Sequence, residues 1–199
     1  MKKLVLCTIT LLLVLSTFGC SKKDLNIDAE QITSDTLVAK SNGQLQVATV
    51  EEFDKDYYQL SELEEFVSEE IKVYNQKAGG DKIAIEDLQL KNNKAVMVLT
   101  YSGMDQYAAF NEVTAAYFNG GVTNIPLSLP DKLKDAKNDS FINTNEALQN
   151  TKYKVLIINE PYDIIVDGKI KYYSENAVMV ENNKIQSAAD DMTIIVFKP

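Results

Sequence analysis

Pairs of carboxylates are the side chains of this sequence best suited to catalysis. Asp54 lies two residues before Asp56, and a second pair, Asp190 and Asp191, is adjacent. Glycoside hydrolysis uses two carboxyl groups, roughly 5 to 9.5 Å apart, as acid and as base or nucleophile. One hypothesis is therefore a hydrolase of glycan whose acids come from separated positions, such as Asp54, Asp139 and Asp190. Neighbouring acids before a helix or strand more often form turns.

Oxygen-bearing side chains between residues 135 and 139 suggest a weak cation site. Asp135, Asn138 and Asp139 are faintly similar to a calcium loop. An EF-hand also requires glycine at its sixth position and glutamate at its twelfth. Counted from Asp135, the sixth residue is Ser140 and only the glutamate at the twelfth position fits. We therefore predict no metal ion or cofactor, and leave open a weak cation site near Asp135–Asp139.

Two further features have an ordinary structural explanation beside a functional one. Glu65 and Glu69 are four residues apart on a predicted helix, where they would bind a cation or simply form its solvated face. The tyrosine doublets Tyr57-Tyr58 and Tyr172-Tyr173 would stack on sugars or on a partner. On a strand, one ring of such a doublet must face outward. Packing remains the more common role of these rings.

The residues that are missing exclude several classes of function. The chain has 29 acidic residues and 20 basic ones, all of them lysine, and it has no histidine or tryptophan. Catalysis by Ser-His-Asp or Cys-His is therefore impossible within this chain, as is the usual zinc site. An acidic chain without arginine also lacks the bidentate contacts of nucleic-acid readers. We therefore expect a protein that is not an enzyme and does not bind nucleic acid.

The amino-terminus has the pattern of an export signal. Lysines at positions 2 and 3 precede the apolar residues 4–15, a run shorter than the roughly 20 residues of a membrane-spanning helix. The run ends in Thr17-Phe18-Gly19-Cys20, which resembles the lipobox of bacterial lipoproteins, although Thr17 and Phe18 depart from the usual residues. The resemblance implies that residues 1–19 are a cleaved signal peptide. It also implies that Cys20 carries acyl chains such as palmitate; the alternative is an ordinary cleaved signal with a stray thiol.

The remaining sequence divides into a tether and a folded domain. Residues 20–35 are polar and aperiodic, which indicates a flexible tether beside the membrane. Its lysines at positions 22 and 23 would lie near anionic headgroups. The only cysteines are Cys7 and Cys20, so the domain at residues 36–199 has no disulfide. This domain is long enough for a single hydrophobic core.

The elements that position these residues are mostly strands. Short turn sequences between alternating apolar runs predict four β-hairpins. Residues 153–159 are almost continuously apolar, which indicates a central strand buried on both faces, and residues 193–198 form a closing strand. The four predicted turns are Asn42-Gly43, Asn92-Asn93, Asp167-Gly168 and Asn182-Asn183.

One amphipathic helix stands between the first two hairpins. Ser61 and Glu64 match a capping box at its start, and Gly79-Gly80 ends it. We expect one apolar stripe to bury the helix against the sheet. The residues of this stripe are Leu63, Phe66, Val67, Ile71 and Tyr74.

Shorter helices complete the predicted α+β fold, in which antiparallel hairpins pack against the main helix. One covers residues 104–112 and is capped by Ser102 or Asp105. Two more are predicted at 130–137 and 144–149. They lie within the irregular segment 119–152, which has the prolines, glycines and asparagines typical of a loop that carries a binding surface.

Three stretches of the chain resemble uncharacterised lipoproteins of clostridia and related low-GC Gram-positive bacteria. They are EEFDKDYYQLSELEEFVSEEIKVYN (51–75), MDQYAAFNE (104–112) and YKVLIINE (153–160). The resemblance implies a location on the outer face of a Gram-positive cell membrane and implies no activity. We therefore expect a lipid-anchored, extracytoplasmic domain that binds an envelope protein or polymer. The alternative is a carboxylate-dependent envelope hydrolase acting on glycan.

Overall fold

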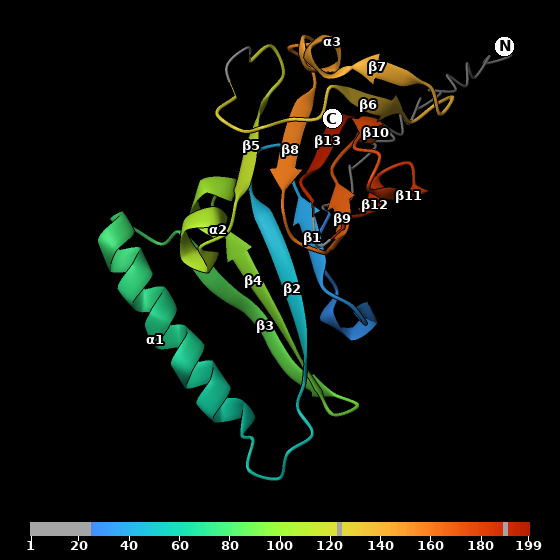
Figure 1. Cartoon of the computed structure of the whole chain (residues 1–199). Coiled ribbons are helices and arrows are strands. Elements are labelled where there is room, and N and C mark those ends of the chain that lie inside the picture. The colour runs from blue at the N-terminus through green and yellow to red at the C-terminus, as the bar shows by residue number, and fades with distance from the viewer. Residues whose placement is uncertain (1–24, 123–124, 189–190) are drawn as a thin grey trace, which may run out of the picture.

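The structure is a computed structural model that describes residues 25–122, 125–188 and 191–199. Two β-sheets pack face to face, and the long helix α1 (Leu60–Ala78) lies beside one end of the first sheet (Figure 1). The predicted α+β fold with one main helix is thus confirmed. The predicted signal peptide 1–19 and the predicted lipidation site Cys20 lie outside the described residues, as does Asp190.

The first sheet has seven strands in the order β11-β12-β9-β1-β2-β4-β3. Its pairings are antiparallel except that β1 runs parallel to β9. Its strands are β1 (Thr36–Ala39), β2 (Leu45–Glu52), β3 (Ile83–Lys91), β4 (Lys94–Tyr101), β9 (Asp163–Val166), β11 (Val178–Glu181) and β12 (Lys184–Gln186).

The second sheet is antiparallel, with six strands in the order β5-β8-β13-β10-β6-β7. The apolar runs predicted as strands at 153–159 and 193–198 form β8 and β13, which are neighbours inside this sheet. The strands are β5 (Ala115–Asn119), β6 (Lys132–Asp135), β7 (Phe141–Asn143), β8 (Lys154–Ile158), β10 (Lys169–Tyr173) and β13 (Thr193–Lys198).

The helix predicted at residues 130–137 is wrong, because most of that segment is strand β6. Leu133 is fully buried there, while Lys132 next to it is exposed, which is the two-residue alternation of a strand. The helix predicted at 144–149 is confirmed as α3 (Thr144–Leu148). No helix among the described residues is both long enough and apolar enough to cross a membrane.

Three of the four predicted hairpins are confirmed: β1–β2, β3–β4 and β11–β12. At Asn92 and Asn93 both residues have the positive φ of a type I′ turn, 50° and 60°. The hairpin predicted at Asp167-Gly168 is wrong, because β9 belongs to the first sheet and β10 to the second. A Cβ atom on Gly168 would lie 2.3 Å from the carbonyl oxygen of Lys198. This glycine therefore permits a close approach of two backbone segments where the chain changes sheets.

Helix α1 ends as predicted but begins differently. Gly79 has φ 73° and terminates the helix in the left-handed conformation. The capping box of Ser61 and Glu64 is wrong, because the helix begins at Leu60 and Gln59 precedes it without a side-chain cap. Helix α2 (Met104–Asn111) also lacks the predicted side-chain cap from Ser102 or Asp105, since Gly103 precedes it.

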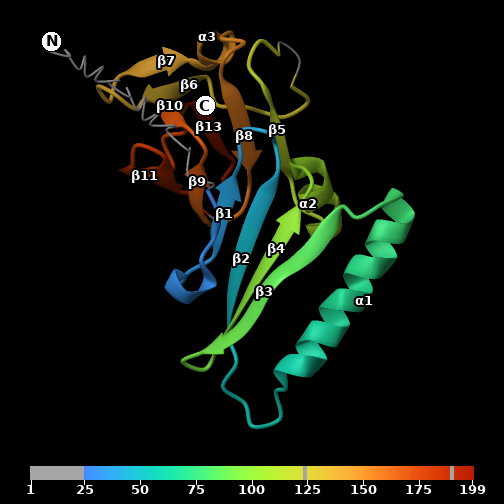
Figure 2. The same cartoon turned by 180° about the vertical axis from the view of Figure 1, so that it is seen from behind.

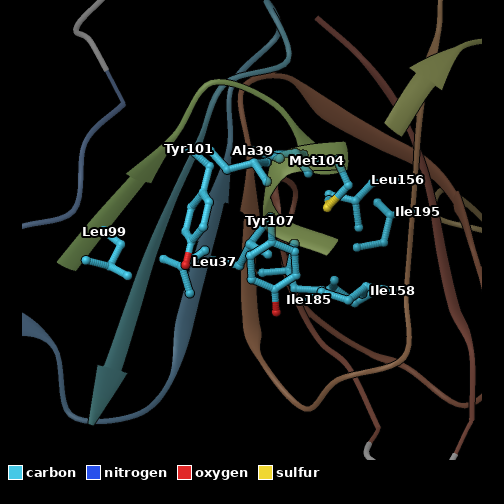
Figure 3. Close-up of a cluster of buried hydrophobic side chains, with 14 of the residues drawn as sticks. Leu37, Ala39, Leu99, Tyr101, Met104, Tyr107, Leu156, Ile158, Ile185 and Ile195 are labelled. Carbon is cyan, nitrogen blue, oxygen red and sulfur yellow. The ribbon is translucent and has the colours of Figure 1, made fainter. Parts of the chain in front are cut away.

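The main hydrophobic core fills the space between the two sheets. Its side chains come from both sheets and from α2, as Figure 3 shows for Leu37, Tyr107 and Ile195. Tyr107 is buried, with 1% of its surface exposed. A second apolar cluster lies on the outer face of the second sheet. It is built on β8 and β13 and contacts the partly buried side chains Ile125, Leu127 and Leu129.

Part of the predicted tether is packed onto the first sheet. Ala29, in the short 3-10 helix η1 (Ala29–Gln31), is 4% exposed and contacts the apolar outer face of β2 and β4. The side chain of Gln46 accepts a hydrogen bond of 2.8 Å from the backbone N–H of Ile27. Asp35 accepts a bond of the same length from the N–H of Val50. These contacts hold Ile27, Ala29 and Asp35, which belong to the predicted tether, against the first sheet.

Candidate functional site

The acids proposed for glycan hydrolysis do not meet among the described residues. Asp54 lies in the β2–α1 connection, where it forms an exposed ion pair of 3.1 Å with Lys55. Asp139 lies in the turn between β6 and β7, at the opposite end of the molecule in both views (Figures 1 and 2). Asp191 accepts a hydrogen bond from the backbone N–H of Met192, as a turn residue does. Asp54 and Asp139 therefore do not form a pair, and Asp190 lies outside the described residues.

The oxygen-bearing segment 135–139 forms the β6–β7 turn. The Asp135 carboxylate accepts a hydrogen bond of 2.7 Å from the N–H of Lys137. Asn138 accepts bonds from both the N–H and the hydroxyl of Ser140. Asp139 has φ 61°, a conformation that aspartate tolerates in turns. These side chains stabilise the turn, and no group of acids suited to a metal ion occurs in the described part of the chain.

The acidic pair on α1 lies on its solvated face. Glu65 and Glu69 are both exposed, and Glu69 forms a 2.8 Å ion pair with Lys72 three residues later. An exposed pair of this kind contributes little to stability. The geometry is that of a solvated helix surface.

The two tyrosine doublets have different surroundings. Tyr57 and Tyr58 lie in the β2–α1 connection, 72% and 42% exposed, with their ring centroids 4.9 Å apart. Tyr173 is buried in the main core, whereas Tyr172 contacts the outer apolar cluster. The prediction that one ring of a strand doublet faces the other way is confirmed for this second pair.

A groove of about 470 Å³ lies between α1, α2 and the first sheet and is here called the α1 groove. Its floor includes Val47, Met97 and Leu99 from β2 and β4. Its walls include Phe66 and Val73 of α1. Further lining comes from Phe110 and Glu112 at the end of α2 and from Tyr162 in the β8–β9 connection.

Helix α1 is attached to the rest of the protein by only a few contacts. Only Val67 and Ile71 of its nineteen residues are buried. Asn75 fastens the helix to the start of β3: its side chain donates to the carbonyl of Ile83 at 2.8 Å and accepts from the N–H groups of Lys82 and Ile83. The attachment thus lies mainly between Val67 and Asn75.

One residue of the predicted stripe does not pack on the sheet. Phe66 is 65% exposed, although its helical spacing places it beside the buried positions. Val73, another apolar residue of α1 that lines the groove, is 37% exposed. Two exposed apolar side chains of α1 therefore border the α1 groove.

Two tyrosine hydroxyls at the groove have protons left to donate. The Tyr101 hydroxyl accepts from the Asn111 amide at 3.3 Å, and the Tyr162 hydroxyl accepts from Tyr107 at 3.1 Å. Among the described residues, neither accepting hydroxyl has an acceptor for its own proton. Burial raises the pKa of Tyr101 to about 12 and raises the pKa of Tyr162 as well. Both groups therefore stay protonated at neutral pH and can donate to a ligand.

The surroundings of the groove are acidic. Residues 45–91, which include β2, α1 and β3, contain twelve acids and five lysines. Glu70 and Glu112 are exposed at the groove, while Lys77 is the lysine that lines it. The charged side chains that line the groove are therefore two glutamates and one lysine.

The α1 groove could not be anticipated from the sequence. The spacing of Phe66 predicts burial, and nothing in the sequence places Tyr162 opposite α1. Comparisons with models of known protein families, with curated proteins and with solved structures found no match to this chain. The candidate site therefore rests on its geometry and charge.

Proposed function

We propose that this protein is a lipid-anchored binding domain on the extracytoplasmic face of the cell membrane, without enzymatic activity of its own. Its site is the α1 groove, and its ligand is a cationic, amphipathic segment of an envelope protein. The single observation that carries the proposal is the apolar groove left open beside exposed Phe66. The anchor is the acylated thiol of Cys20, supported by the lipobox-like sequence that precedes it.

The chemistry of the groove supports this type of ligand. Apolar side chains of the segment would contact Met97 and Phe66, and its lysine or arginine side chains would lie near Glu70 and Glu112. Backbone carbonyl groups of the segment would accept hydrogen bonds from Tyr162. A segment with alternating apolar and basic residues satisfies all three requirements.

The anchor is tested by Cys20→Ser. The full chain, expressed with its own signal in a Gram-positive host, should sediment with membranes, and the variant should appear in the medium or the soluble fraction. Mass spectrometry of the wild-type amino-terminal peptide should show added acyl mass. Wild-type protein that is found in the soluble fraction without acyl mass would disprove the anchor and leave the groove untouched.

The groove is tested by fluorescence anisotropy with the full chain in a non-ionic detergent. The probe is a labelled twelve-residue peptide of alternating leucine and lysine; glutamate-leucine and lysine-serine peptides are its comparisons. Only the first should bind, and Phe66→Ser should weaken it at least tenfold. The matched control is Val178→Ser, since Val178 is 61% exposed on the distant strand β11. Equal losses in both variants would reject the α1 groove as the site.

A charge substitution sharpens the same test. Glu70→Gln should weaken the leucine-lysine peptide by a smaller factor and reduce the dependence of its affinity on salt. Glu65→Gln is the control, because Glu65 is on the same helix but does not line the groove. An identical effect of the two substitutions would show that the acidic helix attracts the peptide without specific docking.

A further inference from the structure

A second cleft, far from the α1 groove, combines lysine and tyrosine side chains. It has a volume of about 410 Å³ and lies along β10 on the second sheet. Tyr153 and Tyr172 lie together in it, with ring centroids 6.4 Å apart and planes inclined by 57°. We call it the lysine cleft, because its lining also includes Lys137, Lys169 and Lys171.

A β-bulge brings a cation and an aromatic ring to the same side of the strand. Along β10, Ile170 lies opposite Phe197, but Tyr172 lies opposite Val196, so one extra residue is accommodated between them. Regular alternation would send Lys171 and Tyr172 to opposite faces. With the bulge, Ile170 is buried in the main core and also borders the cleft, and Lys171 and Tyr172, which follow it, both line the cleft. Bulges that redirect a side chain in this way are common next to functional sites.

The charge of the cleft is opposite to that of the whole protein. Lysines that form ion pairs among the described residues are found elsewhere, at positions 55, 72, 94 and 184. Lys137, Lys169 and Lys171 have no such partner within the described ranges. Asp135 is the acid that lines the cleft, and its carboxylate accepts a bond from the backbone N–H of Lys137. Three ammonium groups against one carboxylate leave an excess of positive charge in a protein whose formal net charge is −9.

The ring surfaces distinguish this cleft from a simple basic patch. Tyr153 and Tyr172 are both half-buried, so each is fixed by packing and still has surface in the cleft. Aromatic faces bind the apolar faces of sugar rings, and lysine ammonium groups bind phosphate or carboxylate as point charges. The two requirements together select a sugar that carries a negative charge.

We propose that the lysine cleft binds an anionic carbohydrate, with a sugar ring against Tyr172 and its phosphate or carboxylate between Lys169 and Lys171. This site is independent of the α1 groove and of the cationic ligand proposed there. Binding of an acidic glycan would give the domain a second contact, on the opposite side from helix α1 in Figure 1.

The experiment is isothermal titration calorimetry of the full chain in a non-ionic detergent. Two anionic probes, polygalacturonate and a poly(hexose phosphate), separate a carboxylate source from a phosphate source. Dextran is the neutral sugar probe, and inorganic polyphosphate provides charge without a sugar. We expect one or both anionic sugar polymers to bind, dextran not to bind, and polyphosphate to bind at least tenfold more weakly.

Variants separate the specific site from general attraction. Lys171→Gln should weaken polymer binding at least fivefold, whereas the control Lys82→Gln, in the connection between α1 and β3, should leave it unchanged. Tyr172→Leu should weaken binding while Tyr172→Phe retains it, because the phenylalanine ring preserves the stacking surface; melting temperatures verify that both variants are folded. Equal effects of Lys171→Gln and Lys82→Gln would overturn the proposal, as would polyphosphate binding equal to that of the sugar polymers or no binding by any probe.

Discussion

Helix α1 and strand β8 show two different uses of apolar residues in one chain. In β8 the four residues from Val155 to Ile158 have no exposed surface. In α1 only two of nineteen residues are buried, and Phe66 remains 65% exposed. The strand contributes to the core on both of its faces, whereas the helix is attached along one narrow line.

This difference indicates that the core provides stability and that helix α1 is the more easily opened element. Burial of apolar surface dominates folding, so the two-sheet core, with β8 and β13, carries most of the stability. Helix α1 contributes little burial and depends on Asn75 and a short apolar contact. Elements with few buried contacts open at lower free energy than the core, and binding elements are drawn from them. The α1 groove lies at the boundary between these two regions.

The largest effect should come from the core. Phe197→Ala removes a fully buried ring from β13 and should lower the free energy of unfolding by about 4 kcal/mol. Chemical denaturation monitored by circular dichroism measures this loss. A loss similar to that of an α1 variant would show that the two regions share the stability evenly.

The second-largest effect should be a loss of stability at alkaline pH, caused by the buried tyrosine Tyr101. Burial raises the pKa of Tyr101 to about 12, against about 10 in the unfolded chain. Below pH 10 both states are protonated, and between pH 10 and 12 the unfolded chain loses its proton first. The free energy of unfolding should therefore fall by about 3 kcal/mol across this range from Tyr101 alone. Denaturant titrations from pH 9 to 12 test this, and Tyr101→Phe should flatten the decline.

The attachment of α1 should be worth less than a core ring. Asn75→Ala removes three hydrogen bonds to the start of β3 and should cost about 2 kcal/mol. Amide hydrogen exchange should then accelerate along α1 while β8 and β13 stay protected. An equal acceleration of amide exchange in β8 would contradict the conclusion that α1 opens independently of the core. Gln76→Ala is the matched control, because Gln76 is exposed on the next helical position.

The smallest stability effect should come from the groove itself. Phe66→Ser replaces an exposed side chain by one of similar helix propensity and should change the free energy of unfolding by less than about 0.5 kcal/mol. The same variant should lose peptide binding, so stability and binding would be separated at one residue. A destabilisation above about 2 kcal/mol would mean that Phe66 packs more closely than its exposure indicates.

Local features of this fold were predictable from the sequence, and pairings between distant segments were not. The Asn92-Asn93 turn and the end of α1 at Gly79 depend on the conformations of a few residues, and both predictions are confirmed. The turn at Asp167-Gly168 has the same local signal, yet its two strands join different sheets. Strand β10 joins the second sheet because it pairs with β13 and β6. No sequence pattern near Gly168 predicts these pairings.

The candidate sites were beyond prediction for the same reason. The α1 groove depends on how far Phe66 lies from the sheet, and the lysine cleft depends on the bulge beside Lys171. Both are properties of tertiary packing. Among the acids that the sequence highlights, Asp54 and Asp139 lie in a connection and a turn far apart in the fold (Figure 1).

The parallel pairing of β1 with β9 determines when this fold can form. Thr36 lies opposite Asp163. Strand β1, near the beginning of the domain, can therefore complete its pairing only after β9, near the end, is available. A chain that emerges amino-terminus first exposes an unpaired edge of the β1–β2 hairpin until residue 166 is available. Pairings of such long sequence separation slow folding to milliseconds or seconds, roughly the range of all-β domains. The first sheet therefore stays incomplete until residues 163–166 are available, long after the β1–β2 hairpin can form.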